Sequence, residues 1–235
     1  MAEDYIEQLF NAAIKSNADI TICDLFESQN GVNTEIIRIG TNLQTWDIDE
    51  IKRKSLLYGT SVWQCLYKRE LFFDNDLFFP ENLFFEDNAI MGALVASAKK
   101  IAKVDKSLYY YRRDNASTTR SINNYRYFDR LVTAVMFLNH FKRLGLYEKF
   151  KPEVDWAFTK LYYINTIGGC LQNFEPIEFN KLMEVRREFP KYMPDYTSNR
   201  YYNSETTRNQ RVFLSLVRCM PRLACLLWKI RIKLS

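Results

Sequence analysis

The feature that most constrains the fold of this chain is a change of periodicity near Tyr125. Up to about Arg120, short runs of β-branched and apolar residues alternate with segments in which apolar residues recur every three or four positions. Beyond Tyr125 only the helical pattern continues. A chain of 235 residues has room for one large domain or two small ones. The pattern therefore predicts an α/β layer followed by a mainly α-helical C-terminal region.

Local signals place the individual elements. Helices are expected over 5–16, 48–57 and 88–99, with a short one from Lys68 and a capping box between Asp4 and Glu7. Strands are expected over 20–26, 34–39, 61–67 and, around a turn, over 101–104 and 108–112. In the second part, helices are expected over 127–144, 154–171, 177–189 and 206–233, the last one broken at Pro221. The prolines of 189–200 predict a loop there.

Composition excludes several kinds of site. The five cysteines are scattered without a C-x-x-C pair, and His140, predicted to lie on a helix face, is the only histidine. A disulfide framework and metal sites built on several histidines are therefore not expected. No apolar run approaches the ~20 residues of a membrane-spanning helix. The acidic N-terminus is unlike a signal peptide, so we expect a cytoplasmic protein.

Positive charge is concentrated at the C-terminus. The chain carries a net charge of +5, and seven basic residues but no acidic one follow Glu205. The body lacks a basic surface, so no nucleic-acid partner is expected. In 206–235, apolar and basic residues alternate at helical spacing, with Trp228 suited to a headgroup boundary. This pattern predicts a peripheral segment on the anionic inner face of the plasma membrane; packing against the body is the alternative.

Two acidic residues, Glu86 and Asp87, stand at the start of the helix expected over 88–99. One interpretation is structural: Asp87 caps the helix and Glu86 interacts with its positive end, which together stabilises the fold by ~1 kcal/mol. The other is catalytic, because a carboxylate held by a rigid element beside a cleft can act as a general base.

The segment 108–120 contains arginines and hydroxyl groups directly after a predicted strand. The guanidinium groups of Arg112 and Arg113 suit the oxygens of a diphosphate, which they bind in a bidentate manner. The alternative is a hairpin turn at Asp114 and Asn115 with solvated arginines.

Four segments, in this order and spacing, resemble family 2 glycosyltransferases of the GT-A fold: 18–24, 62–72, 84–88 and 110–117. The resemblance covers roughly residues 1–120. It implies a partial GT-A, Rossmann-like mixed sheet with flanking helices over 1–122, on the acceptor side of such a domain. A helical region over 123–205 and the membrane-surface segment over 206–235 would then follow.

The resemblance also implies roles for individual residues. Asp87, with Glu86, stands at the position of the catalytic base, and Arg112, Arg113 and Ser117 lie near the donor diphosphate. Trp63 would stack on the acceptor sugar, although a place in the core is the alternative. The implied reaction is an inverting transfer from a nucleotide-sugar to a hydroxyl of a saccharide or lipid-linked acceptor, in the synthesis of a surface polysaccharide.

The sequence departs from this family in two places. Members carry a nucleotide-binding segment that ends in an Asp-x-Asp metal motif, and here Glu3 stands at its second carboxylate. Mg²⁺ or Mn²⁺ is the implied cofactor, and the donor-binding half is expected to be missing. Cys65 stands where a lysine is usual. The alternative function is therefore a non-catalytic remnant, or half of a split enzyme, that binds a protein partner at an exposed sheet edge.

Overall fold

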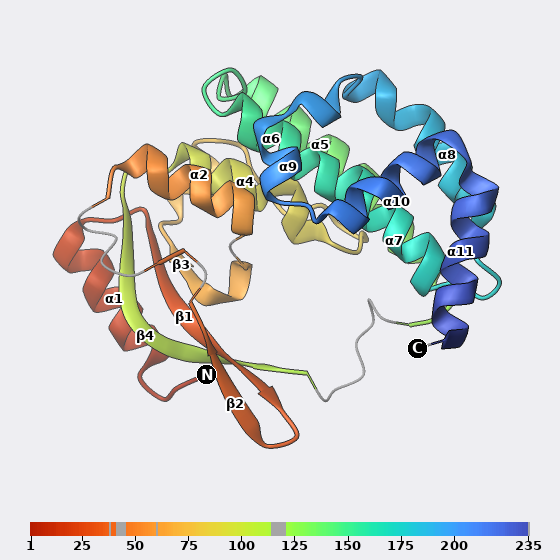
Figure 1. The fold of residues 1–235 in the computed structure, drawn as a ribbon. Helices are drawn as coiled ribbons and strands as arrows, with labels where there is room; N and C mark the ends of the chain where they lie inside the picture. The colour runs from red at the N-terminus through yellow and green to blue at the C-terminus, as the bar shows by residue number, and fades with distance from the viewer. Residues whose placement is uncertain (38, 41–45, 60, 114–120, 235) are drawn as a thin grey trace.

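The computed structural model describes residues 1–37, 39–40, 46–59, 61–113 and 121–234, with side chains through Ile230. A small mixed sheet forms one side of the molecule, and helices that follow it in the chain form the other (Figure 1). The fold is α/β with a mainly helical C-terminal region, as the change of periodicity predicts.

The sheet is built around β1 (Ile20–Gln29). β2 (Val32–Ile36) and β3 (Cys65–Tyr67) pair with different parts of β1 in antiparallel orientation. β4 (Ile101–Arg112) runs parallel to β1 along its other side. Within the described residues β4 pairs with no strand except β1, so its outer edge has no strand partner.

β4 is one long strand, so the prediction of two strands around a turn is wrong. The register between β1 and β4 shifts on both sides of Asp24, and this irregularity accommodates the polar residues that suggested the turn. A buried ion pair lies at the same place, with Lys103 Nζ 2.6 Å from Asp24 Oδ2. The polar residues of this stretch therefore pair within the sheet.

Helix α1 (Tyr5–Ser16) covers one face of the sheet, where Tyr5 and Leu9 pack against Cys23 and Leu108. Both ends of the helix agree with the prediction, but the capping box does not form. The Asp4 carboxylate accepts a hydrogen bond from the Gln8 side chain and from no backbone N–H of the first turn.

The opposite face carries α2 (Ile48–Tyr58) and α4 (Glu86–Ser97). Two short helical segments, η2 (Val62–Gln64) and α3 (Glu70–Phe73), lie between them in the chain. Gly92 allows a close approach of the next helix to α4. A Cβ at this position would lie only 2.4 Å from Phe137 of α5 (Asp129–Arg143).

The second part of the chain is helical throughout. Its remaining elements are η4 (Tyr125–Phe128), α6 (Lys151–Phe158), the π-helical turn η5 (Thr159–Ile164), α7 (Asn165–Gln172), α8 (Phe179–Tyr192), η6 (Tyr196–Ser198), α9 (Arg200–Ser204), α10 (Arg208–Cys219) and α11 (Pro221–Leu234). α6, η5 and α7 form one continuous rod. Their buried side chains belong to the same core as those of α2 and α4.

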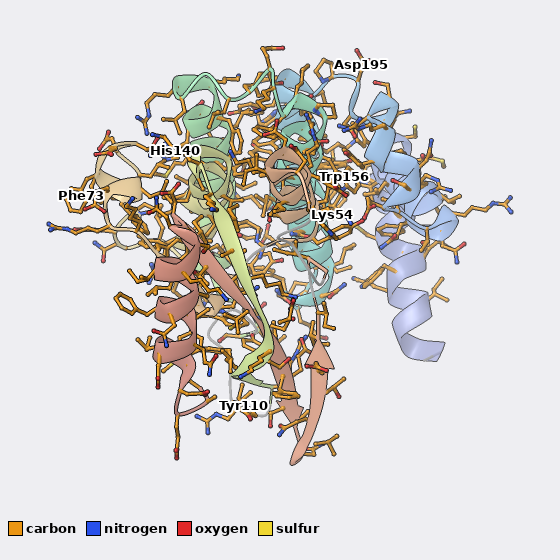
Figure 2. All side chains as sticks on the ribbon, turned by 90° about the vertical axis from the view of Figure 1, so that its left-hand side faces the viewer. Lys54, Phe73, Tyr110, His140, Trp156 and Asp195 are labelled. Carbon is orange, nitrogen blue, oxygen red and sulfur yellow. The ribbon has the colours of Figure 1, made fainter. Side chains whose placement is uncertain are left out.

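The loop predicted over 189–200 is only partly present. α8 continues to Tyr192 and includes Pro190, because Phe189 stacks on Tyr163 of η5 with ring centroids 4.5 Å apart. The packing offsets the hydrogen bond that the proline cannot make. His140 lies on α5, as predicted, and Figure 2 shows Trp156 among the helices and Tyr110 at the far end of the sheet.

None of the helices in the described ranges is long and apolar enough to cross a bilayer.

A buried carboxylate joins helices α2, α6 and α9. The side chain of Glu153 is fully buried, and its oxygens accept from Arg53 Nη1 at 2.8 Å, from the Tyr201 hydroxyl at 2.5 Å and from Arg200. Burial raises the pKa of Glu153, but the hydrogen bonds lower it by more, so that its pKa lies below the usual value. The charged form is therefore the stable one in the fold.

We expect Glu153→Gln to lower the free energy of unfolding by about 2 kcal/mol at pH 7, because two charge-assisted hydrogen bonds are weakened. Since the folded pKa is depressed, this stabilisation is present above the ordinary pKa of 4.5 and is lost as the pH falls through the folded value. Urea unfolding followed by circular dichroism at pH 7 and pH 3 measures both effects. The control Glu50→Gln alters an exposed pair and should change stability by less than about 0.5 kcal/mol. Equal stability of wild type and Glu153→Gln at pH 7 would contradict the assignment.

Candidate functional site

Asp87 is the second residue of α4. The chain enters this helix through Phe85, whose φ of 62° is left-handed, so that Glu86 and Asp87 form the first turn. Glu86 is exposed and Asp87 is half-buried. Asp87 Oδ1 accepts a hydrogen bond from the backbone N–H of Asn88 at 2.8 Å. The carboxylate thus satisfies one of the N–H groups that a helix start leaves open. It does so from inside the helix, because the N-cap is Phe85, so the prediction that Asp87 caps this helix is wrong.

Tyr67 lies close to the same carboxylate. Its hydroxyl donates to the Val62 carbonyl at 3.2 Å and lies 3.4 Å from the sulfur of Met91, one helical turn after Asp87. Burial raises the pKa of Tyr67 far above its ordinary value, and the charge of Asp87 adds to this effect. Tyr67 is therefore a neutral neighbour of Asp87.

A cavity of about 220 Å³ opens beside α4. It lies between α2, α4, α5 and η5, and its walls include Ser55, Asn88, Met91, Lys160 and Asn165. Asp87 is not itself part of the lining, but Asn88, the next residue, and Met91, one helical turn later, both are. The carboxylate of Asp87 is therefore adjacent to the wall of this cavity.

The pKa of Asp87 is raised. Burial is the largest cause, the charge of Glu86 is the second, and hydrogen bonds from the backbone N–H groups of Asn88 and Asp87 oppose them. The positive end of the helix therefore does not keep the pKa of Asp87 low, because the cost of removing the carboxylate from water exceeds the stabilisation by these N–H groups.

The basic side chains near this region are Lys160 and Arg130. Lys160 lines the cavity, and its ammonium group donates to the Leu57 carbonyl. The guanidinium of Arg130 lies between two rings, 4.2 Å from the centroid of Phe85 and 3.9 Å from that of Tyr127. Phe85 is the N-cap of α4, so Arg130 packs against the residue directly before this helix.

Arg112 and Arg113 lie elsewhere, at the end of β4. Arg113 pairs with Glu27 of β1, with Nη2 and Oε1 2.6 Å apart. Arg112 is exposed, and within the described ranges it forms no ion pair. Neither arginine lines the cavity beside α4, and Figure 1 shows this end of β4 well away from α4. Ser117 and the predicted turn at 114–115 lie outside the described residues.

Trp63 packs on the sheet. Its indole stacks on Tyr109 and Tyr111 of β4, with centroids 4.2 Å and 5.4 Å apart, and its carbonyl accepts from the Tyr5 hydroxyl at 2.7 Å. These contacts favour the structural role that the sequence left open. An aromatic platform for a sugar at Trp63 stays a prediction.

Glu3 is exposed and lies two residues before α1. In the part of the chain that the structure describes, no three His, Cys, Asp or Glu side chains lie close enough together to hold a metal ion. The Mg²⁺ or Mn²⁺ site implied for Glu3 stays a prediction, and no step below depends on a metal.

The sequence interpretation missed Arg130 and Lys160. Arg130 occupies a core-facing position of α5, four and seven residues before the buried Ala134 and Phe137. A charged residue at an apolar position of a helix is a signal that could have identified it.

Comparison with known proteins supports the fold. No protein-family model matches the sequence, and no curated protein matches it. Solved structures do match. They include residues 1–349 of Staphylococcus aureus TarS, with a TM-score of 0.52 and 17% sequence identity over 92% of this chain and 58% of that one. TarS 1–349 in complex with UDP-GlcNAc matches with a TM-score of 0.43 and 17% identity, over 68% of this chain and 53% of the other.

The chain thus spans less than two thirds of the length of these structures. TarS is a glycosyltransferase, and the likeness at 17% identity concerns the fold. The chain has a glycosyltransferase-like fold.

We expect Asp87→Asn to raise the melting temperature at pH 7. Asn keeps the oxygen that accepts the Asn88 N–H but removes a charge whose burial is unfavourable. Because the pKa of Asp87 is raised in the fold, the unfavourable effect grows as the pH rises past the ordinary pKa of 3.8 and is absent below it. Calorimetric melting at pH 3.5 and pH 7 measures this difference. A lower melting temperature of the variant at pH 7 would show that the carboxylate is a net stabilising cap.

Proposed function

We propose that this chain forms the acceptor side of a nucleotide-sugar-dependent glycosyltransferase of family 2, with the GT-A fold. The position of Asp87 carries the proposal: a half-buried carboxylate in the first turn of α4, directly before the cavity-lining Asn88, in a chain with a glycosyltransferase-like fold. Its raised pKa brings its basicity closer to that useful for proton transfer near neutral pH.

The proposed reaction is an inverting transfer. The acceptor hydroxyl oxygen attacks the anomeric carbon on the face opposite the diphosphate, while Asp87 takes the hydroxyl proton, and the bond to the diphosphate breaks. Proton transfer must accompany attack because a hydroxyl is a poor acid. Tyr67, which stays neutral, lies near Asp87 and adds no charge beside its carboxylate.

The donor is proposed to be a nucleotide-sugar. TarS, whose fold the chain shares, has been crystallised with UDP-GlcNAc. Arg112 is exposed at the end of β4 and forms no ion pair within the described residues, so its guanidinium is available to diphosphate oxygens. Arg113 is engaged by Glu27 and would have to leave this partner to bind the donor.

The second candidate is a binding module, either a non-catalytic remnant or half of a split enzyme. The outer edge of β4, which has no strand partner among the described residues, favours it, because such an edge can pair with a strand of another chain. Calorimetric titration of the purified chain with UDP-GlcNAc separates the two. Micromolar binding supports the enzyme, and absence of binding favours the module.

In a polypeptide in which this segment follows a nucleotide-binding region, we expect Asp87→Asn to lower kcat by about 10²–10⁴-fold, as expected for loss of a general base. Release of UDP from UDP-GlcNAc in the presence of acceptor measures this change. The matched control is Glu81→Gln, an exposed carboxylate ahead of α4, which should keep full activity. The acid limb of the pH–rate profile should lie above pH 3.8 and disappear in Asp87→Asn. Undiminished turnover of Asp87→Asn would remove Asp87 as the base.

We also propose that α10 and α11 attach the protein to an anionic membrane surface. One side of this pair packs on the body through Leu214, Val217, Ala224 and Cys225. Apolar side chains nevertheless remain exposed next to the basic ones: Val212, Met220, Leu226, Leu227 and Ile230. Trp228, expected at the headgroup boundary, instead packs against Phe213 with centroids 5.7 Å apart.

We expect the protein to sediment with vesicles of anionic phospholipid, and this binding to weaken as salt is raised from 50 to 500 mM. Arg218→Gln combined with Arg222→Gln should weaken it further, whereas Arg187→Gln, an exposed arginine on α8, is the control. Equal sedimentation with neutral vesicles at high salt would contradict the electrostatic attachment.

A further inference from the structure

A second hollow lies between the α6–η5–α7 rod and the C-terminal helices. This groove has a volume of about 1270 Å³. Its walls come from η4, the start of α5, the rod, and the segment from Glu205 to Trp228. Figure 1 shows α10 crossing the α7 end of the rod and α11 beyond it. The groove exceeds the 300–1,000 Å³ typical of small-molecule pockets, so it has room for a ligand of several sugar units.

Arg130 supplies a positive charge that no carboxylate of the described residues neutralises. The residue is only 8% exposed, and its Nε donates a hydrogen bond to the Tyr127 carbonyl at 3.2 Å. In the described parts of the chain it forms no ion pair. Tyr127 can lie beneath it because position 169 is a glycine: a Cβ there would come within 1.9 Å of the Tyr127 ring. A buried guanidinium with no counterion is unfavourable unless a ligand supplies one.

Lys160 supplies a second positive charge. It lines the groove and donates to the Leu57 carbonyl, and across the described ranges it has no ion-pair partner. Glu205 is the only acidic residue among the described ones that line the groove. Its attraction raises the pKa of Lys160 by less than burial lowers it. The groove therefore has an excess of positive charge.

The remaining walls suit a polyhydroxylated ligand. The indole N–H of Trp156 is buried and has no hydrogen-bond acceptor in the described structure, and Trp156 lines the groove. Side-chain amides, which both donate and accept hydrogen bonds, also line the groove at Asn165, Gln172, Asn173 and Asn209. Aromatic surfaces of Phe213 and Trp228 complete the lining. Amides, aromatic faces and an open N–H together match the hydroxyls and apolar faces of sugar rings.

The groove and the cavity beside α4 meet at the π-helical turn. Lys160 and Asn165 line both of them. The hydroxyl of Tyr127 donates to the Asn165 carbonyl at 2.9 Å, which connects the Arg130 side of the groove to the same turn. An oligosaccharide bound in the groove can therefore extend toward the cavity that Asn88, the residue after Asp87, lines.

We propose that this groove binds an acidic oligosaccharide, whose carboxylate or phosphate group lies against Arg130 and Lys160. The proposal rests on the proposed function, in which this oligosaccharide is the acceptor. Arg130 and Lys160 are binding residues, and they select an acceptor that carries negative charge.

Titration of the purified chain with tetragalacturonate, without any nucleotide-sugar, tests the proposal. We expect saturable binding, with at least tenfold weaker binding of the neutral cellotetraose. Lys160→Met keeps the length of the side chain but removes its charge, and it should weaken tetragalacturonate binding at least tenfold. Glu205→Gln removes the acidic residue of the groove and should strengthen binding about threefold or more. The control is Lys54→Met. Lys54 is a partly exposed lysine of α2 that lies over the ring of Trp46 and does not line the groove, so this variant should bind as wild type.

Other results would overturn the proposal. Saturable binding could be absent, cellotetraose could bind as tightly as tetragalacturonate, or Glu205→Gln could leave the affinity unchanged. Glu205 is partly exposed, and thermal melting verifies that the Glu205→Gln variant is folded. If tetraglutamate bound as tightly as tetragalacturonate, the groove would be a site for acidic peptides. If inorganic phosphate displaced tetragalacturonate at similar concentration, the groove would be a simple anion site. Because no donor is present, the result is independent of Asp87. If tetragalacturonate binds in the groove but Asp87→Asn keeps full activity, the proposed function is overturned and the groove remains an oligosaccharide-binding site.

Discussion

Burial of α4 on all sides is the constraint on which the rest of the structure depends. Its residues Ala89, Ile90, Met91, Ala93, Leu94, Val95 and Ala96 are all buried, so the helix has no solvent-exposed stripe over this stretch. The sheet lies on one side and α5 on another, at a distance that Gly92 makes possible. A helix held this way has one position and one rotation. The first turn, with Asp87, is therefore fixed in space although its own carboxylate adds little to the packing.

Two groups stand out among the buried and half-buried charges of this molecule, while the buried Lys52 of α2 belongs to neither. Glu153 and the pair of Asp24 with Lys103 have partners that compensate the loss of water, and they connect elements of the fold. Asp87, Arg130 and Lys160 have no charged partner of opposite sign at ion-pair distance within the described residues. All of the second group lie around the α4 entrance and the two hollows. Uncompensated charge is common at binding and catalytic sites, because the ligand supplies what the protein omits.

The sequence predicted elements whose signal is local and missed those that depend on contacts across the fold. The ends of α1 and the position of α4 follow from periodicity and from turn residues such as Asn17. The continuity of β4 does not, because it depends on a register shift against β1. The site divides in the same way. Asp87 stands in a recognisable motif. Lys160 follows it by more than seventy residues, and only the packing of the helices brings Lys160 into the same cavity as Asn88, the residue after Asp87.

The π-helical turn between Thr159 and Ile164 is the place where this rod can lose a residue without turning its far end. A turn of this kind holds one residue more than an α-helical turn, so its loss would restore regular winding and leave the helix beyond in nearly the same rotation. Loss of a residue from the α-helical parts of the rod would instead rotate everything downstream by about 100°. If that residue lay before Gly169, this glycine would no longer face Tyr127, and a bulkier side chain would meet that ring. Related chains should therefore vary in length at their surface loops or at this turn, and keep the residue count of α6 and α7 unchanged.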